Sequence, residues 1–192
     1  MFKRTLLTAA LLGLSSFAFA DPVTFELDPA HTNVVASWSH LGFSNPVAHF
    51  GDVDGTLVYD AEDVGASSVT VTLPLSGLDG HVDAFNDHLR SADLFDAAQY
   101  PEITFASTAV EAVGEGKLEI TGDLTIKGIT RTVVLDATLN GAGPHPMAGR
   151  EAIGFDASMT VKRSEFGLGY AVPAVSDEIT LRITTEGLVP EV

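Results

Sequence analysis

The sequence predicts an all-β protein in which about eight antiparallel strands close into an extended barrel with one short helical insert. Three observations predict this fold. Apolar residues alternate with polar ones over most of the chain beyond residue 68, turns that contain glycine separate the alternating runs, and one segment alone has helical spacing. Closing such a sheet removes the unpaired edges that promote aggregation.

The alternation is clearest between Lys117 and Lys127. Leu118 and Ile120 share one face of the expected strand, whereas Lys117 and Glu119 lie on the other. A period of two with one apolar face is typical of an antiparallel strand that is buried on one side. Similar strands are expected in the runs 68–75, 103–105, 133–139, 153–161 and 179–183, and less regular ones over 23–27, 34–39 and 50–59. In the last of these, Gly51 and Gly55 indicate bends or bulges.

The helical insert is expected over residues 83–91. Phe85 and Leu89 are four residues apart, which places them on one face of a helix, and Asp83 is a suitable residue to begin it. We expect the helix to lie across or beside the barrel with both apolar side chains buried.

Residues 1–20 have the pattern of a signal peptide. Lys3 and Arg4 precede an apolar run from Leu6 to Leu14, and the small-residue end Ala18-Phe19-Ala20 follows. The apolar run is shorter than the ~20 residues that span a bilayer, which argues against a membrane-spanning anchor. We therefore expect export to the periplasm, with residues 21–192 as one domain.

Charge and composition exclude several classes of function. The formal net charge of −16 becomes −18 when Lys3 and Arg4 are left out, so nucleic acid and anionic membrane surfaces are poor partners. The chain contains no cysteine, which excludes disulfides, thiolate chemistry and iron–sulfur ligation.

The face that closure would enclose is apolar. A barrel of about eight strands has room for packed side chains or for one small ligand, and an apolar cavity would hold hydrocarbon. The residues expected to contact such a ligand are Val71, Leu73, Phe105, Leu118, Ile120, Leu135, Phe155, Phe166 and Leu181.

Five stretches resemble the YceI-like family of lipid- or polyisoprenoid-binding proteins. They are Leu27–Thr32, Trp38–Gly42, Asn86–Asp96 running into Tyr100–Ser107, Gly122–Thr130 and Arg163–Gly167, in the family's order. The resemblance implies a lipocalin-like barrel that holds an isoprenoid chain or another long-chain amphiphile, with the head group near the mouth. Members of this family are often exported.

Candidates for a head-group site come from the polar residues of these stretches, namely His31, His40, Asn86, His88 and Arg90. Each has a structural alternative. The two histidines of the first two stretches could instead stabilise turns. Arg90 could bind a phosphate through its planar guanidinium, or pair with Asp87, Asp93 or Asp96 and fix the helix to the barrel. Short-range pairing is the commoner use of such residues and is favoured here.

Neither a metal, a cofactor nor an enzymatic activity is expected. None of the six histidines has metal-ligand spacing to another histidine with a nearby carboxylate; they are His31, His40, His49, His81, His88 and His145. No Gly-x-Ser-x-Gly element or zinc-protease motif occurs.

The sequence therefore predicts a carrier whose partner is an isoprenoid, quinone or fatty-acid-type lipid, and a homodimer is compatible with it. Two alternatives stay open. The protein could be an enzyme acting on such a lipid with His31 or His88 as the base, or a structural envelope stress protein whose barrel is fully packed.

Overall fold

A computed structural model describes residues 21–191, so the expected signal peptide lies outside the described residues. One short α-helix, α1 (Asp83–Arg90), and one sheet of eleven strands make up most of this part of the chain. The strands are β1 (Val23–Leu27), β2 (Asn33–Ser37), β3 (Val47–Phe50), β4 (Asp54–Tyr59), β5 (Ser68–Pro74), β6 (Leu78–Asp79), β7 (Glu102–Gly114), β8 (Lys117–Ile126), β9 (Ile129–Pro144), β10 (Glu151–Lys162) and β11 (Glu178–Leu188).

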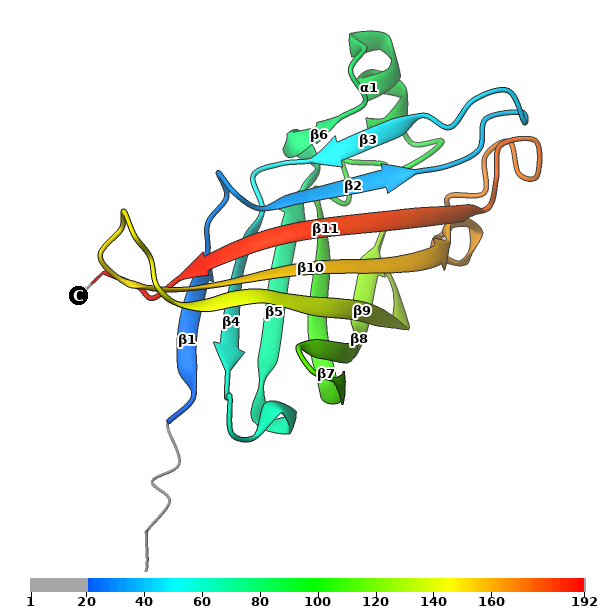
Figure 1. The fold of residues 1–192 in the computed structure, drawn as a ribbon. Helices are drawn as coiled ribbons and strands as arrows, with labels where there is room; N and C mark the ends of the chain where they lie inside the picture. Colours follow the sequence, from blue (N-terminus) through cyan, green and yellow to red (C-terminus); the bar gives the residue numbers. More distant parts are fainter. Residues whose placement is uncertain (1–20, 192) are drawn as a thin grey trace, which may run out of the picture.

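Eight of these strands form a closed antiparallel ring, which confirms the predicted barrel (Figure 1). The order around the ring is β1, β4, β5, β7, β8, β9, β10 and β11. Closure comes from β1 and β11, which pair at Glu26 with Leu188 and at Leu27 with Gly187. The long strands β7 to β11 make up most of the wall.

The other three strands, β2, β3 and β6, extend the sheet from the part of β11 that does not pair with β1. Residues Thr180–Thr184 of β11 pair with β2, which in turn pairs with β3, and β3 pairs with β6. The irregular stretch expected over 50–59 is divided, since Phe50 ends β3 and residues 54–59 form β4. The chain bends between β3 and β4, where Asp52 has a positive φ of 54°, and the two strands lie in different parts of the sheet.

The helix lies at the end of the barrel where β3 and β6 extend the sheet (Figure 1). Leu89 is buried and Phe85 is half-buried against the core, as expected for its apolar face. The helix begins at Asp83, as expected, with Val82 as its N-cap residue, and it ends one residue before the expected Ser91. No helix within residues 21–191 is long and apolar enough to cross a membrane.

The sequence alternation gives the correct register. On β8, Leu118 is buried and Ile120 half-buried, whereas Lys117 and Glu119 are exposed. Gly122 on the same strand leaves room for an inward aromatic ring, since a Cβ there would lie 2.3 Å from Cζ of Phe105. The apolar positions of the strands therefore face one enclosed space.

Candidate functional site: an apolar cavity and its vestibule

A cavity of about 190 Å³ lies inside the barrel. Its wall is built from the inward positions of the ring strands and is almost entirely aliphatic and aromatic. All nine residues that the sequence assigns to the interior are part of this wall: Val71, Leu73, Phe105, Leu118, Ile120, Leu135, Phe155, Phe166 and Leu181. Several of them are half-buried rather than fully buried, because they border a hollow instead of packed neighbours.

Three hydroxyl side chains of the cavity wall, those of Thr32, Ser67 and Thr185, have hydrogen-bond partners. The hydroxyls of Thr32 and Thr185 lie 2.9 Å apart and hydrogen-bond to each other. The hydroxyl of Ser67 accepts a hydrogen bond from the backbone N–H of Asp60 at 3.0 Å. A wall of this kind offers little to a polar guest and is suited to a hydrocarbon.

A second hollow of about 510 Å³, here called the vestibule, adjoins the cavity at the helix end of the barrel. Its lining contains Trp38, His40, Phe85, His88 and Tyr170, so it combines apolar surface with polar tips. The two hollows share the wall residues Ala36, Phe50, Phe95, Arg163, Leu168 and Ile179. A long amphiphile could thus place its tail in one and its head group in the other.

Two of the five head-group candidates line the vestibule. His40 follows β2, and His88 lies on α1 with its ring edge-on to Tyr170 at a centroid distance of 5.2 Å. Asn86 instead uses its side-chain oxygen to accept from the backbone N–H of Gly80 and donates to Asp79. His31 lies at the other end of the molecule, in the turn between β1 and β2.

Arg90 fixes the helix to the barrel, although not through the carboxylates considered from the sequence. Its Nε donates to the carbonyl oxygen of Leu75 at 2.9 Å, and its Nη2 donates to the carbonyl oxygens of Ser76 and Leu78. Among the described residues no carboxylate lies within ion-pair distance of this guanidinium. The guanidinium is therefore occupied by the backbone and is poorly placed to bind a phosphate.

Arg163 lines both hollows. Only 8% of the residue is exposed. Its guanidinium donates to four carbonyl oxygens of the segment that precedes β11, those of Leu168, Tyr170, Val175 and Ser176. Burial lowers the pKa of this guanidinium and Asp177 opposes the shift, but an arginine stays charged in either case. Its charge is thus offset by backbone dipoles, which fix the path of the loop.

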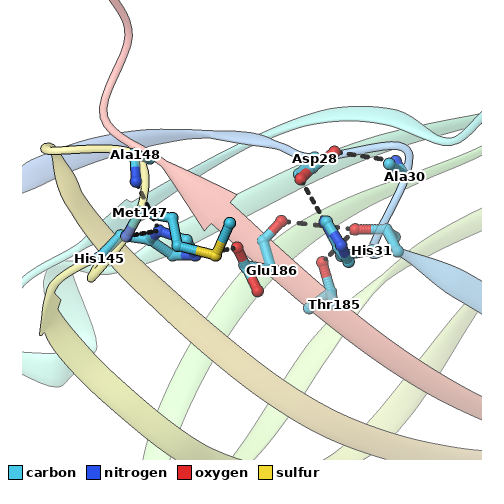
Figure 2. Close-up of polar contacts among 9 residues, drawn as sticks. Asp28, Ala30, His31, His145, Met147, Ala148, Thr185 and Glu186 are labelled. Atoms are coloured by element: carbon cyan, nitrogen blue, oxygen red, sulfur yellow. Dashed lines mark hydrogen bonds and ion pairs between the residues drawn. The ribbon is translucent and has the colours of Figure 1, made fainter.

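The described residues contain one cluster that could hold a metal ion, at the end opposite the vestibule (Figure 2). Ligand atoms of Asp28, His31 and Glu186 lie within 4.8 Å of one another. Nδ1 of His31 lies 2.6 Å from Oδ2 of Asp28. The other carboxylate oxygen of Asp28, Oδ1, accepts a hydrogen bond from the backbone N–H of Ala30. Hydrogen bonding within the turn explains this contact without an ion.

The neighbouring His145 does not complete a metal site. Its Nδ1 accepts hydrogen bonds from the backbone N–H groups of Met147 and Ala148, at 3.2 and 2.9 Å (Figure 2). A neutral ring then carries its proton on Nε2, which lies 3.3 Å from Oε1 of Glu186. That nitrogen is a donor and has no lone pair for a metal. The cluster thus joins the β1–β2 turn and the β9–β10 loop to β11.

The Asp28–His31 contact shifts both groups. The hydrogen bond to His31 holds the pKa of the Asp28 carboxyl below its usual value, and the same bond raises the pKa of the His31 imidazole. The pair is exposed, so solvent screens its attraction.

Residues 25–187 match the model of the YceI-like domain. The chain belongs to the YceI-like family. Protein YceI of Escherichia coli O6:H1 is 36% identical over 180 residues, which cover 94% of this chain and 93% of that protein. The UPF0312 protein plu2095 of Photorhabdus laumondii is 37% identical over 191 residues, covering 98% of each chain.

Solved structures share the fold. BcnA of Burkholderia cenocepacia has a TM-score of 0.76 at 27% identity, covering 83% of this YceI-like chain and 98% of its own. A polyisoprenoid binding domain from Saccharophagus degradans, implicated in plant cell wall breakdown, has a TM-score of 0.66 at 13% identity, covering 88% and 99%. At 13% identity, the similarity to the Saccharophagus degradans domain shows only that the two chains share a fold.

Sequence reasoning missed most of the vestibule. Trp38 and Tyr170 come from segments 132 residues apart, and neither segment has a period that indicates a shared hollow. Trp38 could have been found, because it lies in one of the stretches that resemble the family and is the chain's single tryptophan. Tyr170 had no comparable marker.

Replacing Arg163 should destabilise the barrel strongly. Arg163→Lys keeps the charge but cannot reach four carbonyl oxygens at once, and each buried carbonyl left without a donor costs about 1–3 kcal/mol. We expect the free energy of unfolding in urea to fall by at least about 2 kcal/mol. The control is Arg182→Lys, which alters an exposed arginine of β11 and should change little. Equal effects of the two substitutions would contradict this role.

The His31 contact predicts a pH dependence of stability. A raised pKa in the folded state gives a stabilisation that is complete below the ordinary value of 6.5 and is lost as the pH rises through the shifted value. Asp28 needs its charge, so its contribution is lost in strong acid. From about pH 5.5 to about pH 8.5, the melting temperature of the unaltered protein should therefore fall slightly more than that of His31→Gln. Parallel curves for the two proteins would show that the contact contributes nothing.

Proposed function

We propose that this YceI-like protein is a periplasmic binding or carrier protein for a long-chain isoprenoid or a related amphiphilic lipid. The observation that carries the proposal is the apolar cavity beside a larger vestibule, which shares six of its wall residues and also has polar side chains in its lining. The apolar cavity suits the hydrocarbon tail of an amphiphile, and the polar side chains of the vestibule suit its head group. A periplasmic location is supported by the signal-peptide pattern of residues 1–20.

Tail burial would supply most of the affinity. Each buried methylene contributes about 0.8 kcal/mol before the cost of ordering the chain, and a prenyl chain carries many such groups. The polar groups that remain for the head are few, since Arg90, Arg163 and Asn86 are already hydrogen-bonded within the protein. His40 and His88 are the side chains best placed to contact the head group, and they suit a loosely selected alcohol, quinone or phosphate.

The structure of the vestibule favours binding over catalysis. Its lining includes two histidines, His40 and His88, but no serine, threonine or carboxylate. A general base with neither a nucleophile nor an orienting carboxylate nearby lacks the arrangement that hydrolases use. The cavity also argues against a fully packed structural barrel. The likeness to the Saccharophagus degradans domain agrees with lipid binding, although it rests on fold.

Filling the cavity should weaken binding of a long tail. Ala157 lies on β10 and borders the cavity, so Ala157→Phe places a ring where the tail would lie. We expect the dissociation constant for a long-chain prenyl alcohol to rise at least about tenfold, as loss of two or more methylene contacts would produce. Trp38 fluorescence in the vestibule, or displacement of a fluorescent fatty acid, provides the measurement.

Ser158→Phe is the matched control. Ser158 is the next residue of β10 and its side chain is exposed, so the same ring is added outside the barrel. This variant should bind the lipid as the unaltered protein does, and circular dichroism should show both variants folded. Binding that is unaffected by Ala157→Phe in the folded protein would exclude the cavity as the tail site.

A further inference from the structure

Large apolar side chains are exposed beside the vestibule. Phe43 is 93% exposed and Leu41 52%, both in the loop between β2 and β3. Tyr170, which lines the vestibule, is 53% exposed and lies in the segment between β10 and β11. Exposed phenylalanine in water is unfavourable unless another apolar phase covers it.

The two loops form one surface. The backbone N–H of Leu41 donates to the carbonyl oxygen of Ala174 at 3.1 Å, and that of Ser176 donates to Ser39 at 3.0 Å. His40 also forms a β-bridge with Val175. Figure 1 shows these loops side by side at one end of the barrel. We call this surface, formed by residues 38–46 and 168–176, the rim.

The rim carries no formal charge. Residues 29–51 and 166–176 contain no aspartate, glutamate, lysine or arginine, although the whole chain has 26 acidic and 10 basic residues. A charged side chain placed against an apolar phase has a high desolvation cost, so its absence from both loops permits close contact with such a phase. The tyrosine, the tryptophan and the histidines near the rim are amphipathic side chains suited to a membrane–water interface.

We propose that the rim docks on the surface of a lipid bilayer with zwitterionic head groups, inserting Phe43 and Leu41 and facing the vestibule toward the membrane. The proposal rests on the proposed function, because a carrier of membrane-derived lipid needs a place of exchange. A zwitterionic surface is favoured because the net charge of −16 opposes approach to an anionic one. The bilayer thus covers apolar surface that water otherwise contacts.

The opposite end of the barrel supplies a matched control. Met147 is 91% exposed in the loop between β9 and β10, which Figure 1 shows at the far end from the rim. Charged groups lie at the same loop, since His145, which accepts from the backbone N–H of Met147, contacts Glu186, and Arg150 pairs with Glu191. Met147 is as exposed and nearly as apolar as Phe43, but a bilayer that contacted it would also desolvate these charges.

Vesicle flotation with phosphatidylcholine tests the proposal on the unaltered protein, Phe43→Ser and Met147→Ser. All three have the same N-terminus, so any contribution from residues 1–20 is common to them. We expect Phe43→Ser to lower the partition coefficient about tenfold, whereas Met147→Ser leaves it within about twofold. Adding an anionic lipid should weaken binding of the unaltered protein at low salt. Equal partitioning of the three proteins would overturn the proposal.

Two further measurements separate this inference from its alternatives. If Phe43 instead covers a second copy of the chain, Phe43→Ser will lower the mass seen by analytical ultracentrifugation and leave flotation unchanged, which overturns the proposal. Binding of farnesol, followed without vesicles by Trp38 fluorescence, tests the proposed function alone. Farnesol binding without vesicle docking would support the carrier function and overturn the rim as a membrane site. Vesicle docking without farnesol binding would support the rim as a membrane site and count against the carrier function.

Discussion

The closure of a sheet with one apolar face is the constraint on which the rest of the structure depends. In an antiparallel sheet the inner side chains alternate with outer ones, so the ring encloses aliphatic and aromatic groups contributed by every strand. Eight strands enclose more space than these side chains fill, and a cavity is left. No polar network is required to create the site, because its chemistry follows from the same alternation that folds the sheet.

The two ends of the barrel differ because β11 changes partners along its length. At Gly187 and Leu188 it pairs with β1 and closes the ring, whereas from Thr180 to Thr184 it pairs with β2 and lets the sheet continue outward. The second arrangement opens the end where α1 and the two loops form the vestibule. Arg163 and Arg90 then fix these elements by binding backbone carbonyl groups. Both guanidinium groups thus hold the backbone that shapes the site.

The fold was predictable from the sequence because strand alternation is a local pattern. Leu118 and Ile120 lie where their period places them, and the helix differs from its expected bounds by one residue. The sequence indicates a bend at Gly51, next to Asp52, but it does not indicate that β3 and β4 lie in different parts of the sheet, because that depends on which strands they pair with.

The site was predictable only where it follows from strand alternation. The interior followed from alternation, but the partners of Arg90 did not, because carbonyl oxygens of a distant turn leave no trace in the sequence. The vestibule likewise depends on tertiary contact between loops that are far apart in the chain. The charge-free character of those loops, in contrast, can be read directly from the residues.

The central claim is that the barrel holds a lipid tail, and native mass spectrometry tests it most directly. The protein would be purified without detergent from the cells that make it, sprayed under native conditions, and then extracted with organic solvent to identify any released molecule. A barrel that holds a lipid tail should give a non-covalent adduct with a long hydrocarbon chain that is absent after extraction. A protein that has only the mass of its polypeptide, and that takes up no long-chain lipid when one is supplied, would contradict the account.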